Sequence, residues 1–182
     1  MDVVSVYVHI PFCRSKCAYC DFNSYAGLEH LYDPYVQALA RDIRLVGEGL
    51  SLQARTIYLG GGTPTVLPLS LVDEALSALR QAFRVTSDVE VAIEANPGAV
   101  DSDYLAGLLN LGVNRLSFGV QSLDDGLLRI LGRIHTAAEI DRPGLQGKRL
   151  ANQPYIPRQR MHIGFKEVFQ SGIRVKVAVS AF

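Results

Sequence analysis

Three cysteines stand close together near the start of the chain, and their spacing has the clearest chemical meaning in the sequence. The run reads Cys13-Arg-Ser-Lys-Cys17-Ala-Tyr-Cys20 and directly follows an alternating apolar stretch. Three thiolates on one short loop can bind three irons of a [4Fe-4S] cluster and leave the fourth iron open to a small ligand. Structural zinc normally takes a fourth Cys or His, and the chain has 3 Cys in all. The spacing therefore favours an open [4Fe-4S] site, with zinc or unliganded thiols as the alternatives.

The overall composition excludes several classes of protein. The 182 residues carry 18 Lys+Arg and 18 Asp+Glu, and 48% of them are hydrophobic, which is typical of a globular chain. A net charge of zero provides no basic field for nucleic acid. The opening residues alternate polar with apolar and read as a strand, not as a signal peptide, and the glycines and prolines of 56–72 argue against a membrane helix. We therefore expect a cytoplasmic protein with reduced thiols, no transmembrane segment and no nucleic-acid partner.

Up to about residue 135, apolar strands alternate four times with amphipathic helices. This alternation predicts parallel βαβ units. Each strand has one apolar face and one small or polar face, which is typical of a barrel lumen that holds a polar ligand. Four units are about half of an eight-unit barrel, so we expect an α/β fold, a partial TIM-like (βα) barrel of about four units. The expected strands are Val3–Ile10, Thr56–Leu59, Glu90–Ala95 and Arg115–Gln121.

Two further patterns concern the helix starts and the end of the chain. Asp33, Ser70, Asp101 and Ser122 precede the helical periods and are expected near the helix starts as caps. Residues 1–140 hold 10 Lys+Arg and 16 Asp+Glu, whereas residues 141–182 hold 8 and 2. We therefore expect residues 1–140 to be the N-terminal part of the barrel core. Residues 141–182 should be an atypical basic tail, mostly irregular, with a short helix over 165–170 and a strand over 174–182.

Several sequence blocks, taken together, resemble the radical S-adenosylmethionine (SAM) superfamily. Over residues 3–140 the chain is similar in particular to the group of oxygen-independent coproporphyrinogen III oxidases and the related haem chaperone HemW. The resemblance implies a partial six-unit radical-SAM barrel whose [4Fe-4S] cluster binds the amino and carboxylate groups of SAM and reduces it to a 5′-deoxyadenosyl radical. The blocks are Tyr7-Val-His-Ile-Pro-Phe-Cys13 continuing to Cys20-Asp-Phe22, Tyr58-Leu-Gly-Gly-Gly-Thr-Pro-Thr65, Glu94-Ala-Asn-Pro97, and Arg115-Leu-Ser-Phe-Gly-Val-Gln-Ser122 continuing to Leu131-Gly-Arg-Ile-His135.

The candidate SAM-binding residues combine this resemblance with their own chemistry. The glycine turn after the second strand could donate N–H groups to the SAM carboxylate or hold its ammonium. Glu94, on the lumen face, needs a partner such as a ribose hydroxyl because an unpaired charge there is costly. The alternatives are a tight turn for the glycines, an anchor or ion pair for Glu94, a satisfied amide for Gln121, a surface position for Arg133, and core packing for the two tyrosines. The full set is Tyr7, Tyr19, Gly61, Gly62, Thr63, Glu94, Gln121 and Arg133.

One position separates the two functions within the group. Coproporphyrinogen oxidases of this type usually carry a further Cys two residues after the third ligand, where this chain has Phe22. Phe22 favours the haem-chaperone branch, which implies binding haem, delivering it to haem-requiring proteins and accepting electrons from a donor. The alternative is oxidative decarboxylation of coproporphyrinogen III.

The resemblance ends at about Ile140. The family's fifth strand with its SAM-contacting aspartate, its sixth unit and its C-terminal domain are not recognisable in the residues that follow. Together with the reversal of charge, this leads us to expect a truncated or frame-altered product, so an inactive fragment is the third alternative. Residues 141–164 are then expected to be mobile, and the strand over 174–182 to pair at the edge of the fourth strand.

Overall fold

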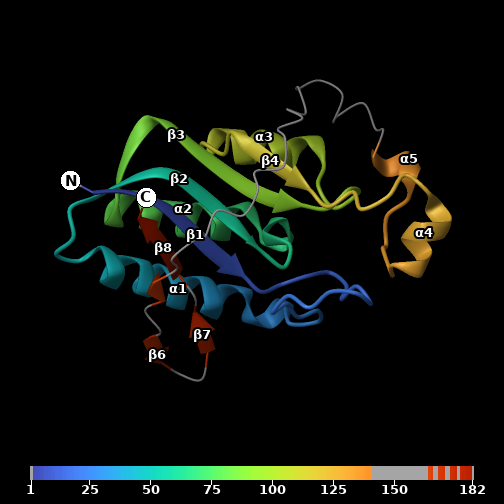
Figure 1. The fold of residues 1–182 in the computed structure, drawn as a ribbon, viewed down its shortest axis with the longest axis horizontal. Helices are drawn as coiled ribbons and strands as arrows, with labels where there is room; N and C mark the ends of the chain where they lie inside the picture. Colours follow the sequence, from blue (N-terminus) through green and yellow to red (C-terminus); the bar gives the residue numbers. More distant parts are fainter. Residues whose placement is uncertain (1, 141–163, 166–167, 171–172, 176, 182) are drawn as a thin grey trace.

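The computed structural model describes residues 2–140, 164–165, 168–170, 173–175 and 177–181 (Figure 1). The main elements are β1 (Asp2–Ile10), α1 (Tyr32–Gly47), β2 (Leu52–Gly61), α2 (Leu69–Ala82), β3 (Arg84–Ala95), α3 (Ser102–Asn110), β4 (Arg115–Phe118), α4 (Asp125–Ile130) and α5 (Ala137–Ile140). Short 3-10 turns cover Glu29–Leu31 and Pro64–Val66. The last four strands are β5 (Gly164–Phe165), β6 (Val168–Gln170), β7 (Ile173–Val175) and β8 (Val177–Ala181).

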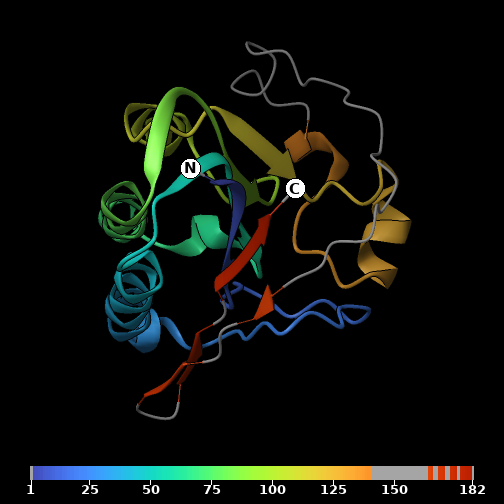
Figure 2. The same ribbon diagram turned by 60° about the vertical axis from the view of Figure 1, so that its left-hand side comes forward.

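Strands β1 to β4 form a parallel sheet in chain order. Their carboxyl ends all point toward the end of the molecule where α4 lies (Figure 1). Helices α1, α2 and α3 lie in a row on one side of this sheet (Figure 2). This arrangement confirms the predicted α/β fold, a partial TIM-like (βα) barrel of about four units.

The core lies between the sheet and this row of helices. On β1, Val4, Val6, Val8 and Ile10 are at most 2% exposed, and the residues between them are half-buried on the opposite face. Helix α1 contributes a buried stripe that includes Val36, Leu39 and Ile43, at the spacing of one helix face. Among the described helices, none combines the length and the apolar composition needed to cross a membrane.

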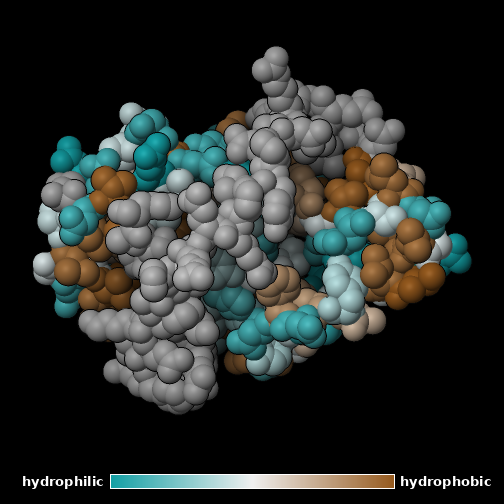
Figure 3. Space-filling view, in the orientation of Figure 1, coloured by the Kyte–Doolittle hydropathy of each residue, from teal (hydrophilic) through white to brown (hydrophobic). Residues whose placement is uncertain are grey.

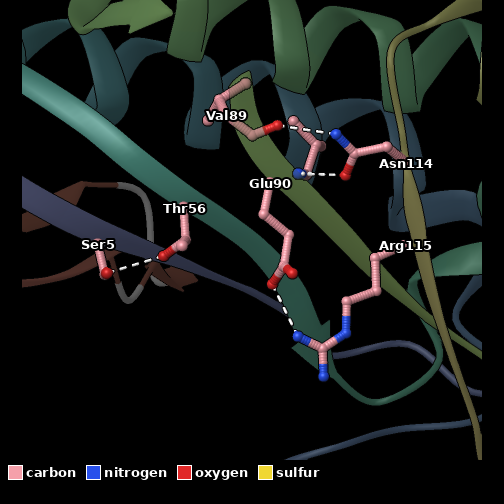
Figure 4. A network of polar contacts seen from close by, with 7 residues as sticks. Ser5, Thr56, Val89, Glu90, Asn114 and Arg115 are labelled. Carbon is pink, nitrogen blue, oxygen red and sulfur yellow. Dashed lines mark hydrogen bonds and ion pairs between the residues drawn. The ribbon is translucent and has the colours of Figure 1, made fainter. Parts of the chain in front are cut away.

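Polar contacts join the start of β4 to the middle of β3 (Figure 4). The Asn114 side chain accepts a hydrogen bond from Val91 N at 2.9 Å and donates one to the Val89 carbonyl at 2.8 Å. Arg115 Nη1 lies 2.7 Å from Glu90 Oε1. The side-chain amide of Asn114 bonds one backbone N–H group and one backbone carbonyl group of β3, as a neighbouring strand would. These two bonds align β4 with β3.

The helix starts agree only in part with the sequence predictions. Asp101 caps α3, as predicted, by accepting a hydrogen bond from Tyr104 N at 2.8 Å. The predicted capping by Asp33 and Ser70 is wrong, because both lie inside the first turn of helices that have no side-chain cap. The residue that caps α4 is Asp124 and not Ser122. Ser122 lies two residues before Asp124 and accepts a hydrogen bond from Asp124 N.

The final segment differs from the prediction in two ways. The short helix expected over 165–170 is wrong, since Val168–Gln170 is a strand paired antiparallel with β7. Apolar, β-branched residues flank Ser171-Gly172 in the sequence, and this hairpin pattern outweighs a helical one. A strand does form within 174–182, but β8 pairs antiparallel with β1 and not with β4. The nine-residue edge of β1 provides more consecutive backbone partners than the four residues of β4. Mobility was expected for residues 141–164, and all of these except Gly164 lie outside the residues that the structure describes.

Candidate functional site

The three cysteines lie on one loop that begins at the carboxyl end of β1. Two backbone hydrogen bonds close the base of this loop, from Cys13 N to the Tyr25 carbonyl at 2.9 Å and from Tyr25 N to the Pro11 carbonyl at 2.8 Å. A tight turn brings Cys20 N to 3.1 Å from the Cys17 carbonyl. All three cysteines are free thiols and partly exposed. The loop therefore presents three thiols from one closed segment of backbone.

The spacing of the three thiols bears on which metal group they could hold. Within the described part of the chain, no three His, Cys, Asp or Glu side chains come together in a way that could hold one metal ion. A cubane cluster binds each cysteine through a different iron, so its ligands need not converge on one point. Three thiols on one loop are the number of protein ligands that an open [4Fe-4S] cluster takes.

A cavity of about 330 Å³ lies between this loop and the strand ends. The three cysteines line it, together with seven of the eight predicted SAM-binding residues. The exception is Tyr7, which is stacked on Tyr58 at a ring separation of 5.9 Å. The volume lies in the range of small-molecule sites, about 300–1,000 Å³. The fold thus brings together, at one place, residues more than a hundred positions apart in the sequence.

The glycine turn at the end of β2 uses its N–H groups within the protein. Gly61 N donates to Glu94 Oε2 at 3.1 Å. Gly62 N and Thr63 N donate to the carbonyls of Ile10 and Phe12 at 2.8 and 2.7 Å, which fixes the turn against the start of the cysteine loop. These three N–H groups therefore already have partners within the protein.

Gly61 has a second requirement, which is steric. Its φ is +116°, a conformation that L side chains rarely adopt. A Cβ at this position would lie 2.5 Å from the ring of His9. Only glycine fits here without moving that ring.

Glu94 is anchored by two groups on the neighbouring strand. Tyr58 Oη donates to Glu94 Oε1 at 2.5 Å, and Gly61 N binds the other carboxylate oxygen. Burial and the hydrogen bond to Glu94 raise the pKa of Tyr58, and burial together with the Glu94 charge raises the pKa of Tyr7 to about 12. The tyrosines therefore stay protonated beside the carboxylate. The alternation of β2 places Tyr58 on the same face as Gly60, a signal that could have singled it out from the sequence.

Arg133 lies inside the site, not on the surface. Its Nη2 donates to Asn96 Oδ1 at 2.6 Å and to the Gly119 carbonyl at 2.7 Å, and its Nη1 lies 3.3 Å from Cys17 Sγ. Arg133 Nε is buried and has no hydrogen-bond partner among the described residues. A buried guanidinium donor left over at a cavity wall is suited to an acceptor on a bound ligand.

Asn96 connects this arginine to the other side of the loop. Its Nδ2 donates to Thr63 Oγ1 at 2.8 Å, and Thr63 Oγ1 lies 3.7 Å from Cys13 Sγ. Thr63 is 4% exposed. Asn96 was not among the predicted site residues, although it follows Glu94 by two positions and so continues the same strand face.

Gln121 and Tyr19 line the cavity from irregular segments. Gln121 was expected to end the fourth strand, but β4 ends at Phe118. Gln121 has φ +62° and is exposed, in a segment where Val120 N and Ser122 N bond backbone carbonyls two residues before them. Tyr19 is 45% exposed on the cysteine loop. Both side chains are therefore adaptable parts of the cavity wall.

Comparisons with known proteins agree with this geometry. The model of the Radical SAM superfamily matches residues 7–142. "Heme chaperone HemW" of Escherichia coli (strain K12) is 41% identical over 141 residues, which cover 76% of this chain and 37% of that protein. "Oxygen-independent coproporphyrinogen III oxidase" of Bradyrhizobium diazoefficiens is 38% identical over 144 residues, covering 75% and 32%. A solved structure described as "Coproporphyrinogen III oxidase (HemN) from Escherichia coli is a Radical SAM enzyme" has a TM-score of 0.69 and 32% identity, covering 76% and 32%.

The matched region contains the whole site. The chain spans about a third of the length of the curated relatives named here. Residues 7–142 nevertheless include β2 to β4, the last four residues of β1, the cysteine loop, the glycine turn, Glu94 and Arg133. The motif order, the parallel sheet and the matched family model agree, and the chain belongs to the radical SAM superfamily.

Proposed function

We propose that this chain binds a [4Fe-4S] cluster through Cys13, Cys17 and Cys20, and SAM in the adjoining cavity. The observation that carries the proposal is the shared cavity, which is lined by all three thiols and by residues from β2, β3 and the segments that follow β4. A bound cluster supplies the single electron that cleaves SAM reductively in this superfamily. The chain's own residues have the task of holding both groups in contact.

The roles follow from the contacts. The turn at Gly61 and Gly62 offers bare backbone for the amino group of SAM, since its N–H groups are already engaged. Glu94 supplies a fixed negative charge for a ribose hydroxyl or the sulfonium. Arg133 has one buried donor left for an acceptor on the ligand. Gln121 and Tyr19, at the rim, are suited to the ribose and the adenine.

We further propose that the wider role is that of a haem chaperone in the cytoplasm, taking haem and handing it to haem-requiring proteins. Phe22 supports this role. It occupies the position of the further cysteine of coproporphyrinogen oxidases, is 68% exposed and lines the cavity. The alternatives are oxidative decarboxylation of coproporphyrinogen III to protoporphyrinogen IX and an inactive fragment.

Anaerobic reconstitution tests the cluster assignment. About one [4Fe-4S] cluster per chain is expected, and replacing any one of the three cysteines by Ala should abolish it, because the chain has no other thiol. SAM should then change the electron paramagnetic resonance signal of the reduced cluster. A full cluster in the Cys17→Ala protein would contradict the assignment.

A second experiment separates the wider roles. The reconstituted protein is titrated with haem and, in parallel, incubated with coproporphyrinogen III, SAM and a reductant. Haem binding without porphyrin product supports the chaperone, product formation supports the oxidase, and neither outcome together with an intact cluster supports the inactive fragment.

A further inference from the structure

In the segment that follows the third cysteine, the carbonyl groups of three consecutive residues, Phe22 to Ser24, bond side chains. Lys16 Nζ donates to the Phe22 carbonyl at 2.7 Å and to the Ser24 carbonyl at 3.1 Å. His9 Nε2 lies 2.8 Å from the Asn23 carbonyl between them. Three consecutive carbonyl groups thus point to two side chains, one from the cysteine loop itself and one from β1.

Lys16 makes the larger share of these contacts. Its third partner is Ser24 Oγ at 3.1 Å, so its three ammonium hydrogens have three acceptors. Hydrogen bonds from a charged donor are stronger than neutral ones. Lys16 stands immediately before Cys17, whereas its acceptors follow Cys20, so the bonds close a ring of backbone around the second and third cysteines.

Ser24 extends the connection to a sulfur. Ser24 is 4% exposed, although its neighbours Asn23 and Tyr25 are exposed. Its Oγ lies 3.8 Å from Cys20 Sγ. The ammonium of Lys16 is therefore one hydroxyl group away from the third thiol.

We propose that Lys16 is a positioning residue for the cluster: it holds Phe22–Ser24 closed so that Cys20 keeps its place, and it fixes a positive charge beside that cysteine. This inference rests on the proposed cluster site. Ordering a loop costs conformational free energy. A loop that is already closed in the free protein binds its cluster more tightly, because this cost does not oppose binding. A positive charge near the cluster also stabilises its reduced form, because reduction adds a negative charge.

The first test uses the protein without a cluster, so that it reports on the loop alone. Hydrogen exchange is measured at the amides of Cys13 and Tyr25, which bond across the base of the loop. Lys16→Met keeps the aliphatic stem and removes the charge, and we expect these amides to exchange at least about tenfold faster, as for the loss of a charge-assisted hydrogen bond. Lys16→Arg should restore much of the protection.

Arg14→Met is the matched control. Arg14 is an exposed cation on the same loop and makes no hydrogen bond to the described residues. Its replacement should leave both amides as in the wild type. Ser24→Ala, which leaves Lys16 intact, is a second test variant, and it should give a smaller acceleration than Lys16→Met. Wild-type exchange rates in both Lys16→Met and Ser24→Ala would overturn the proposal.

The second test uses the reconstituted protein. Lys16→Met should lose its cluster to a chelator severalfold faster than the wild type and have a lower reduction potential, and Lys16→Arg should recover both. A looser loop with unchanged cluster loss and potential would overturn the positioning role and leave Lys16 with a purely structural one. Failure of the wild type to take up a cluster would refute the proposed function instead, and the exchange data would still decide whether Lys16 closes the loop.

Discussion

Glu94 and Glu90 lie four residues apart on β3, and their surroundings differ completely. Glu94 lines the cavity and binds Tyr58 and Gly61. Glu90 lies in the middle of the strand and pairs with Arg115, and the two side chains are 41% and 46% exposed. An exposed pair of this kind contributes little free energy, about 0–1 kcal/mol. The two acids therefore form a matched pair for testing the site.

Replacing Glu94 by Ala is expected to weaken SAM binding by about 1–3 kcal/mol, the scale for losing a hydrogen bond to a charged group. Glu90→Ala should leave the SAM affinity unchanged. Both affinities can be measured by titrating SAM into the reconstituted protein and following the cluster signal. Wild-type affinity in Glu94→Ala would show that Glu94 only anchors the glycine turn.

His135 should respond to pH because of how its ring is held. Its Nε2 lies 3.2 Å from the Val120 carbonyl, and its Nδ1 is buried without a hydrogen-bond partner among the described residues. A second proton on Nδ1 would lack an acceptor, and burial lowers the pKa of His135 from its ordinary 6.5. The unfolded chain therefore takes up this proton at a higher pH than the folded one.

The stability that follows from this shift is complete above pH 6.5 and is lost as the pH falls from 6.5 through the lower pKa of the folded state. Proton NMR should show the His135 resonance titrating below 6.5. In His135→Gln, the free energy of unfolding should fall less steeply over the same pH range. A midpoint above 6.5 would contradict the argument.

At the scale of elements, local patterns predicted the existence of strands and helices better than their ends. The alternation of β1 and the helical periods follow directly from burial on one face, so those elements were predictable. The cap at Asp101 was predicted correctly, but those at Asp33 and Ser70 were not. Helix α1 follows directly on the 3-10 turn Glu29–Leu31 and α2 follows Pro68, so each helix begins one residue before the expected cap. A residue of a type that often caps helices is only a candidate cap until the helix is seen to begin at that position.

This difference gives a direct test on α2 and α3. Asp101→Ala removes the hydrogen bond to Tyr104 N and is expected to lower the free energy of unfolding by about 0.5–2 kcal/mol. Ser70→Ala removes no cap and should change it by less than about 0.5 kcal/mol. Denaturant unfolding of the apo protein measures both. Equal losses in the two variants would show that the capping geometry is not what stabilises these helix starts.

At the scale of the molecule, the sequence predicted which end of the sheet carries the site but not the contacts across it. Parallel strands bring their carboxyl ends together, so the cysteine loop, the glycine turn and Glu94 were expected to meet. The bonds from Arg133 to Asn96 and from Asn96 to Thr63 join residues up to 37 positions apart. They depend on how β2, β3 and the segment after α4 pack, and no local pattern specifies that packing. The pairing of β8 with β1 is long-range in the same sense.

The surface around α4 carries an apolar patch that no described segment covers. The four side chains are Leu123, Leu127, Ile130 and Ile134, which are 74%, 53%, 77% and 63% exposed. Leu127 and Ile130 are three residues apart on α4 and so lie on adjoining positions, with Leu123 before the helix and Ile134 after it. The brown area on the right of Figure 3 lies where Figure 1 shows α4. Isolated exposed aliphatic residues are normal, but a continuous patch promotes association.

We therefore expect these 182 residues to self-associate in a concentration-dependent way. Replacing Leu127 by Glu and Ile130 by Lys together removes two of the most central apolar contacts while keeping the net charge constant. Sedimentation velocity should show this variant shifting toward the monomer, with little change in the free energy of unfolding because both side chains are exposed. Leu45→Lys, at an exposed position on α1, is the control and should associate as the wild type does. A wild-type protein that remains monomeric throughout the concentration series would show that the patch is too small to drive association. It would also show that the exposed edge of the short strand β4 does not pair between molecules.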